Sequence, residues 1–281
     1  MAKALGVFSG PAGRVALLHA TQPLVDHAHP QVHVIFKISG DDTVYLVEGE
    51  AAAATDTQMV LVNPWVAHSN LRPADGSETI LLALYIDAPW FAENCRAILR
   101  GYRNMPFPKT TGNVTPELRL LAADLARQVL DQDQDGRGID ASIDTLMHAV
   151  AAEACPDVLS APRIHHRPFG ADYRIRKAVQ IIRAAPRKTI RIDAIASEVG
   201  LSRSHFHERF RECMGISPGL YIDSFCCDWA AQQLCERTQS VAAIARELGF
   251  SAQSHFTRFF KSKTGVAPRD FRRGHGSRTI L

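Results

Sequence analysis

The residues best suited to chemistry in this 281-residue chain are four histidines in its first quarter. His27, His29 and His33 lie close together, and His68 follows the stretch NPWVA. Neutral imidazoles can hold zinc, iron or nickel, and they can also hydrogen-bond an organic molecule. A catalytic metal would need an open coordination position besides these ligands. The histidines therefore indicate a metal site or a ligand pocket, with ordinary packing as a third interpretation.

Short β-branched or alternating runs surround these histidines between residues 14 and 88. Separated by glycine, proline and aspartate, such runs are typical of half-buried strands joined by turns. The strands are expected at 32–38, 43–47, 59–63 and 79–86. They predict a small β-barrel or sandwich, and helical periodicity then predicts helices at 90–103, 116–130 and 139–154.

Charge divides the chain into two unlike halves. Residues 1–170 hold 13 Lys and Arg against 19 Asp and Glu, whereas residues 171–281 hold 19 against 10. The basic half is attracted to a polyanion, and charge alone fits DNA, RNA or an anionic membrane. The six cysteines form no CxxC pair, so we expect buried, reduced thiols.

The basic half contains a duplicated unit. Residues 192–202 align with 241–251 at a shift of 49, with six identities in eleven positions. Residues 204–218 align with 254–268 at a shift of 50, with six identities in fifteen. One extra residue therefore stands between the two segments of the second copy. Repetition of this kind marks two copies of one supersecondary unit.

Each copy has the pattern of a helix, a tight turn that contains glycine, and a second helix. Ser202 and Ser251 are placed to cap the second helices. Ser240 can cap the first helix of its copy, but Arg191 stands at the matching position, so that helix is expected to lack a side-chain cap.

Two such units favour DNA recognition. In a DNA-reading helix-turn-helix, the second helix enters the major groove. The same geometry occurs in helical bundles without a DNA role, but duplication within a basic domain favours the DNA-binding interpretation. Residues 218–236 read as one helix that would hold the two second helices apart, so that they enter successive major-groove segments about 34 Å apart.

The stretch SVAAIARELGFSAQSHFTRFFKSKTGVAPRDFRR at 240–273 closely resembles the signature of the AraC/XylS family of bacterial transcription regulators. The resemblance covers residues 173–274 and includes a helix near 173–184. It implies a seven-helix domain that binds promoter DNA, a small-molecule-sensing N-terminal domain, a homodimer and contact with RNA polymerase. The connecting helix departs from the family pattern because residues 222–236 contain no arginine, so we expect weaker phosphate contact there.

Carried over by position, the resemblance assigns contacts to DNA bases and phosphates. Gln253 can pair with adenine and Arg258 with guanine. Glu208 can accept a hydrogen bond from cytosine but repels phosphate, so a salt-bridge or solvent-facing role is equally open. The base-reading residues are Ser204, His207, Glu208, Gln253, Ser254, Thr257 and Arg258, and the phosphate-contacting residues are Arg203, Arg211 and Lys261.

The histidine pattern resembles part of a cupin barrel, in which an HxH pair and a distant histidine converge on a metal. The match is partial, because His33 stands where cupins carry an acid and the second motif lacks its glycine. We therefore favour a metal-free pocket for an organic effector over a metal site on the four histidines. The expected pocket residues are His27, His29, His33, Trp65 and His68.

Together these features predict an α+β protein, and its ordinary composition excludes a fibrous or disordered chain. We expect a cupin-like β-barrel with packing helices for sensing and dimerisation at 1–154 and a linker at 155–170. An all-α DNA-binding domain should follow at 171–281, with helix-turn-helix motifs about 192–213 and 241–263.

The predicted function is a sequence-specific transcription regulator, an activator rather than a repressor, controlled by a small molecule. A cupin-type metalloenzyme fused to a DNA-binding domain is the alternative. Catalytic motifs are missing from the sequence, so we expect no enzyme activity and no cofactor. The N-terminus has no secretory pattern, and the apolar runs are too short for a bilayer, which favours the cytoplasm without membrane contact.

Overall fold

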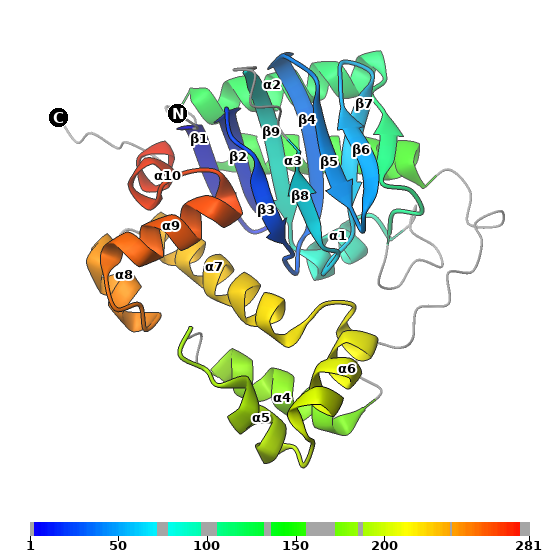
Figure 1. The fold of residues 1–281 in the computed structure, drawn as a ribbon. Helices are drawn as coiled ribbons and strands as arrows, with labels where there is room; N and C mark the ends of the chain where they lie inside the picture. The colour runs from blue at the N-terminus through cyan, green and yellow to red at the C-terminus, as the bar shows by residue number, and fades with distance from the viewer. Residues whose placement is uncertain are drawn as a thin grey trace.

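The computed structural model describes residues 3–71, 78–96, 106–131, 136–155, 172–184, 188–236 and 238–275. These residues form a sheet-rich N-terminal part and a helical C-terminal part, so the predicted α+β class is confirmed (Figure 1). The predicted linker falls, apart from Cys155, outside the described residues. No helix among the described residues is long and apolar enough to cross a membrane.

The described strands form two antiparallel sheets rather than one closed barrel. The larger sheet has the order β1-β2-β9-β4-β7-β10, and the smaller has the order β3-β8-β5-β6. The sheets pack against each other through an apolar layer that includes Ile35, Tyr45 and Val60. The sandwich alternative is therefore the one observed: within the described residues no strand ladder joins the two sheets, as closure would require. The strands are β1 (Lys3–Gly10), β2 (Gly13–Ala20), β3 (Leu24–His27), β4 (Val32–Gly40), β5 (Thr43–Val47), β6 (Glu50–Ala54), β7 (Gln58–Val62), β8 (His68–Asn70), β9 (Thr79–Ile86) and β10 (Thr111–Asn113).

Three helices belong to the N-terminal part: α1 (Ala88–Asn94), α2 (Pro116–Leu130) and α3 (Gly136–Ala154). Helix α2 buries Leu118, Leu125 and Val129 against the larger sheet and α3, as its helical periodicity predicts. The prediction of a helix over 90–103 was wrong in extent, because α1 ends at Asn94, and residues 97–103 lie outside the described part.

The helical part comprises α4 (Tyr173–Ala184), α5 (Ile192–Glu198), α6 (Arg203–Met214), α7 (Pro218–Glu236), α8 (Val241–Glu247), α9 (Gln253–Thr264) and α10 (Pro268–Gly274). Helix α7 has 19 residues and joins the two repeated helix pairs. At a rise of 1.5 Å per residue it is about 28 Å long. Because α7 is packed on more than one side, Ile222 and Ala230 are buried, whereas Phe225 and Trp229 are half-buried.

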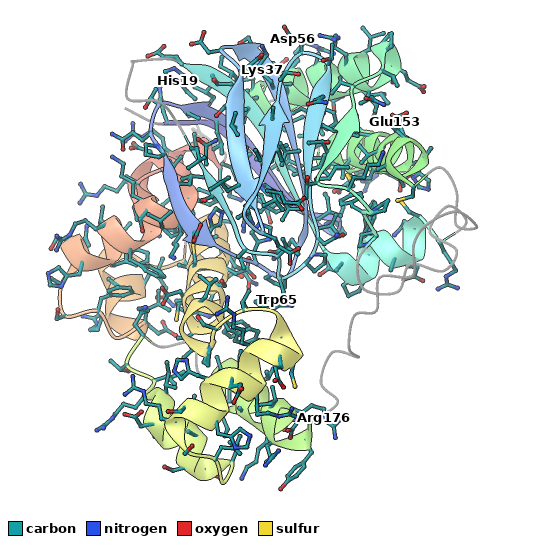
Figure 2. All side chains as sticks on the ribbon, turned by 45° about the vertical axis from the view of Figure 1, so that its right-hand side comes forward. His19, Lys37, Asp56, Trp65, Glu153 and Arg176 are labelled. Carbon is teal, nitrogen blue, oxygen red and sulfur yellow. The ribbon has the colours of Figure 1, made fainter. Side chains whose placement is uncertain are left out.

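The two parts pack directly on each other. Helix α9 lies against β3 and α10 against β1, and apolar residues from both parts belong to one core cluster. Trp65 lies between the sheets and the helical part (Figure 2). Its ring stacks on that of Tyr221 in α7, with centroids 4.5 Å apart. At the same interface, the Lys263 ammonium donates to the backbone carbonyl of Asp26 over 2.8 Å. The helical part is therefore fixed to the sheets through α7, α9 and α10.

Candidate functional site

The repeated helix pairs have the local structure that their sequences predict. Gly200 and Gly249 occupy the left-handed region between the helices, with φ of 70° and 79°. The hydroxyl of Ser202 accepts from the backbone of His205 and caps α6. That of Ser240 accepts from Ala243 and caps α8. Each pair is therefore a short helix, a glycine turn and a longer second helix.

The caps of the two copies differ. Arg191 precedes α5 without a side-chain cap, as predicted. The prediction that Ser251 caps α9 was wrong, because Ala252 occupies the cap position and makes no side-chain bond there. The extra residue of the second copy places Ser251 one position too early, and its hydroxyl lies 3.0 Å from Nδ1 of His255 instead.

Helix α6 presents most of its predicted contact residues to solvent. Ser204, Glu208 and Arg211 are exposed, whereas His207 is half-buried. Arg203 is exposed and forms a 3.2 Å ion pair with Asp193 at the start of α5. Because this pair is exposed, a phosphate group can compete for the guanidinium at small cost.

Helix α9 presents a similar surface. Ser254 and Arg258 are exposed, while Gln253, Thr257 and Lys261 are half-buried. Among the described residues, the Arg258 guanidinium makes no hydrogen bond or ion pair, so it is available to an external acceptor. Buried Phe256 and Phe260 hold the opposite side of α9 in the core. The polar side of the helix is therefore fixed in direction.

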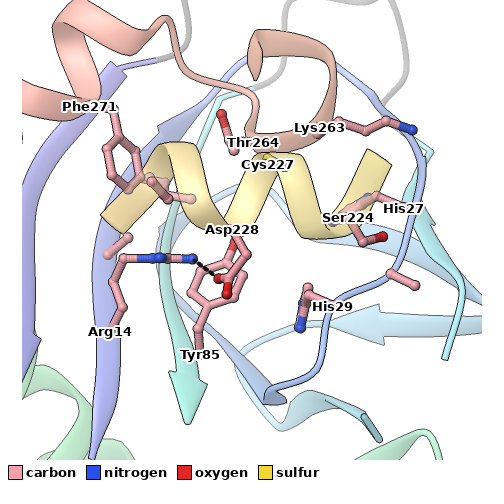
Figure 3. Close-up of a pocket in the computed structure, with 14 residues that line it drawn as sticks. Arg14, His27, His29, Tyr85, Ser224, Cys227, Asp228, Lys263, Thr264 and Phe271 are labelled. Carbon is pink, nitrogen blue, oxygen red and sulfur yellow. Dashed lines mark ion pairs between the residues drawn. The ribbon is translucent and has the colours of Figure 1, made fainter. Parts of the chain in front are cut away.

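A second candidate site lies between the two parts of the chain. It is a pocket of about 560 Å³, open mouth included, bounded by the sheets below and by α7 and α9 above (Figure 3). Its charged and polar lining includes Arg14, His29, Tyr85, Asp228 and Lys263, and its apolar lining includes Ala16, Leu18 and Phe271.

Only part of the predicted histidine pocket lines this space. His27 and His29 line it, whereas His33 and His68 lie beside them in the protein interior. Ring centroids are 4.1 Å apart for His27 and His68, and 4.9 Å apart for His29 and His33. All four imidazoles are thus brought together, but Trp65 is not among the residues of this pocket and packs on Tyr221 instead.

The interior position of the four imidazoles determines their charge. Loss of solvation on burial lowers the pKa of His33 to about 3 and that of His68 to about 4. The same cause, with repulsion from the neighbouring imidazoles, holds the pKa of His27 and His29 well below 6.5. The rings are therefore neutral near pH 7, each with a nitrogen lone pair for a hydrogen bond or a metal.

Four pocket residues were missed in the sequence. Arg14 lies 3.8 Å from the Asp228 carboxylate and has its guanidinium 4.8 Å from the centre of the Tyr85 ring. Lys263 lies 3.9 Å from Asp223 on α7. These residues come from β2, β9, α7 and α9, and nothing in their local sequence shows that the fold brings them together.

Comparison with known proteins identifies the family. A helix-turn-helix domain family matches residues 195–274. The probable transcription factor PqrA of Proteus vulgaris is 37% identical over 83 residues, which are 30% of this chain and 68% of PqrA. A putative AraC-like transcription regulator of Streptomyces antibioticus is 29% identical over 103 residues, 37% of this chain and 34% of that protein. The chain belongs to the AraC family of transcription regulators.

Some of the similar proteins match this chain beyond its helical part. The regulatory protein PocR of Salmonella typhimurium is 25% identical over 189 residues, 67% of this chain and 57% of PocR. Apo ToxT of Vibrio cholerae superposes with a TM-score of 0.60 over 93% of this chain and 96% of ToxT, at 14% identity, which shows a shared two-part fold. The chain spans little more than half of PocR and a third of the Streptomyces protein.

Proposed function

We propose that this protein is a transcription regulator that reads promoter DNA with α6 and α9 and is controlled by a small molecule bound between its two parts. The observation that carries the proposal is the duplicated helix pair, in which both second helices bury phenylalanines and expose polar and basic side chains. AraC family membership supports regulation over catalysis, because the matched relatives are named as regulators.

We assign effector sensing to residues 1–154, the linker to residues 155–170 and DNA binding to residues 171–281. The N-terminal part would sense the effector in a cupin-like sandwich, and the two helix-turn-helix units, about 192–213 and 241–263, would bind DNA. Helix α7, about 28 Å long, would separate the second helices of the two units so that they can enter neighbouring major-groove segments on one face of the duplex. In this assignment Arg258 reads guanine and Gln253 reads adenine, while Arg203, Arg211 and Lys261 neutralise phosphates.

The pocket places a bound ligand in contact with helices that would position the DNA-reading units. The pocket is lined by Ser224 and Asp228 of α7 and by Lys263 and Thr264 of α9, so an occupant touches both the connecting rod and the second reading helix. A ligand that changes this contact would shift how the two units engage DNA. A ToxT structure with a bound unsaturated fatty acid supports ligand control in a protein of the same fold.

Dimerisation and activation complete the proposal. Helix α2 exposes Leu120 and Leu130, with 72% and 51% of their surfaces accessible, on an element that the family resemblance associates with the dimer contact. We infer a homodimer that activates transcription through RNA polymerase. A monomeric mass at micromolar concentration with DNA present would contradict the dimer.

The decisive experiment selects bound sequences from a random DNA pool with the full chain at a stated salt concentration. Wild type should enrich a motif of two elements about one helical turn apart. Arg258→Ala should lose about 1–3 kcal/mol of discrimination at one base step and keep the rest of the motif.

Arg137→Ala is the matched control. It also removes an exposed arginine, but at the start of α3, outside the helical part and α2. It should keep the wild-type profile. If wild type enriches no motif, or if Arg258→Ala and Arg137→Ala enrich the same one as wild type, the assignment of α9 as a base-reading helix is wrong.

A further inference from the structure

Three histidine side chains converge where β3 and β8 meet. His27 ends β3, His29 follows two residues later, and His68 begins β8, which pairs with β3. One ring nitrogen from each of the three lies within 4.8 Å of the others, and all three residues are at least nine-tenths buried. The site is therefore formed by backbone pairing and does not depend on flexible surface chains.

Hydrogen bonds fix two of the rings with one nitrogen directed into the cluster. Nδ1 of His27 lies 2.9 Å from the carbonyl oxygen of Val25, and Nδ1 of His68 lies 2.9 Å from that of Val66. Since a carbonyl oxygen only accepts, each Nδ1 carries the hydrogen, and each Nε2 keeps its lone pair. Metal-binding histidines are commonly held in this way by a carbonyl or carboxylate behind the ring.

Three ring nitrogens of the cluster have no hydrogen-bond partner in the described part of the chain. Both ring nitrogens of His29 and Nε2 of His68 are buried without a hydrogen bond there. Buried polar atoms are nearly always satisfied, so such a group requires an explanation. Because one ring nitrogen of each histidine lies within 4.8 Å of the others, a cation between them would satisfy these nitrogens together.

We propose that His27, His29 and His68 bind a divalent transition-metal ion, with Zn²⁺ as the best match. A set of imidazoles without a carboxylate suits Zn²⁺ and neighbouring ions of the first row, and disfavours Mg²⁺ and Ca²⁺, which prefer oxygen. Zinc–nitrogen bonds of about 2.0–2.1 Å require the nitrogens to approach one another by roughly an ångström, which small ring movements can supply. This proposal differs from the metal-free pocket that the sequence pattern favours, and metal analysis distinguishes the two.

The fourth coordination position would face the pocket. His27 and His29 both line it, opposite Ser224 and Cys227 of α7 (Figure 3). A three-histidine site keeps one position for water or for a donor atom of a bound molecule. The proposal concerns this site alone and stands whether or not the protein regulates transcription.

Metal analysis of the untagged, full-length protein tests the site. The protein is stripped with a chelator, titrated with Co²⁺ and followed by the visible absorption of the bound ion, and Zn²⁺ is then added as a competitor. We expect one equivalent of Co²⁺, displaced by one equivalent of Zn²⁺, and a higher melting temperature with Zn²⁺ present.

Variants locate the ion. His29→Ala and His68→Ala should each weaken metal binding by more than ~10–100-fold, which is the usual loss when only a group that hydrogen-bonds a metal ligand is removed. His148→Ala, which removes a histidine on α3 away from the cluster, should bind like wild type. If a cluster variant fails to fold, the wild-type stoichiometry still decides. No binding of Co²⁺ or Zn²⁺ by wild type at micromolar concentration, or equal binding by all folded variants, overturns the proposal.

Discussion

The contact between Trp65 and Tyr221 should couple the stability of the two parts of the chain. Trp65 is 8% exposed, and its ring stacks on Tyr221 at 4.5 Å with an interplanar angle of 24°. Its φ of 64° lies in the left-handed region, which is rare for a large side chain and persists only where the surroundings enforce it. The stacked ring and the bond from its backbone N–H to the carbonyl of His29 are the contacts that do so.

Trp65→Ala should lower the free energy of unfolding by about 3–5 kcal/mol, the usual cost of truncating a buried aromatic residue. Alanine, like tryptophan, is strained at a positive φ. The substitution therefore does not relieve the backbone strain at residue 65, and no such relief offsets the lost stability. About 0.5–1.5 kcal/mol of it should belong to the ring pair itself.

A double-mutant cycle isolates that share. Urea unfolding of Trp65→Ala, Tyr221→Leu and the double variant should give a coupling energy of about 0.5–1.5 kcal/mol. A control cycle combines Trp65→Ala with Phe260→Leu, a core residue whose ring contacts are with Phe256 and Phe271. The control should be additive within about 0.5 kcal/mol. Additivity in both cycles would refute the idea that this contact links the sheets to α7.

Three further predictions concern the helical part. Ser240→Ala should cost about 1 kcal/mol in urea unfolding, because it removes the cap of α8, whereas Arg191→Ala at the matching, uncapped position should cost little; equal losses would contradict the difference between the copies. Hydrogen bonds from Arg174, and then from Arg209, hold the pKa of Asp172 well below its ordinary value of about 3.9, so this carboxylate stabilises the fold fully above that pH and loses its effect progressively as pH falls from there towards the lowered pKa. Asp172→Asn should therefore melt below wild type at pH 6, and the gap should narrow towards pH 3; a constant gap would show another cause. Lys261→Ala should weaken all DNA sequences alike and reduce the slope of log K against log salt by about 1, and a change confined to one sequence would identify it as a base contact instead.

Helices with strong local signals were predicted from sequence with accurate limits. The ranges of α2 and α7 coincide with those expected, because caps, prolines or apolar periodicity mark their ends. The range of α4 coincides with the one that the family resemblance implies. Strand β6 was missed because Glu50–Ala54 is mostly alanine, a weak strand former. It is held instead by a tight hairpin turn at Glu48 and Gly49, whose φ values of 52° and 85° match a turn that joins adjacent strands, and by pairing with β5.

The candidate sites, too, were predicted only in part from the sequence. The histidines stood out because one residue type recurs over a short stretch, and the structure brings all four together. Arg14, Tyr85 and Lys263 could not be found in this way, since ordinary residue types from distant elements acquire their meaning only when α9 packs on β3. The base contacts, carried over by position from the family resemblance, stay predictions. The missing cap at Ser251 was not predicted, because an insertion of one residue changes which side chain reaches the helix end.

The central claim is that α6 and α9, held apart by α7, read one face of DNA at the same time. The most direct measurement compares affinities for the selected site with five and with ten base pairs inserted between its two elements. If α7 holds the two helices at a fixed separation, both insertions should reduce the affinity to that for a single element. On a fragment that carries only the element read by α6, Arg258→Ala should cause no further loss of affinity. Unchanged affinity after either insertion would contradict simultaneous reading by the two helices.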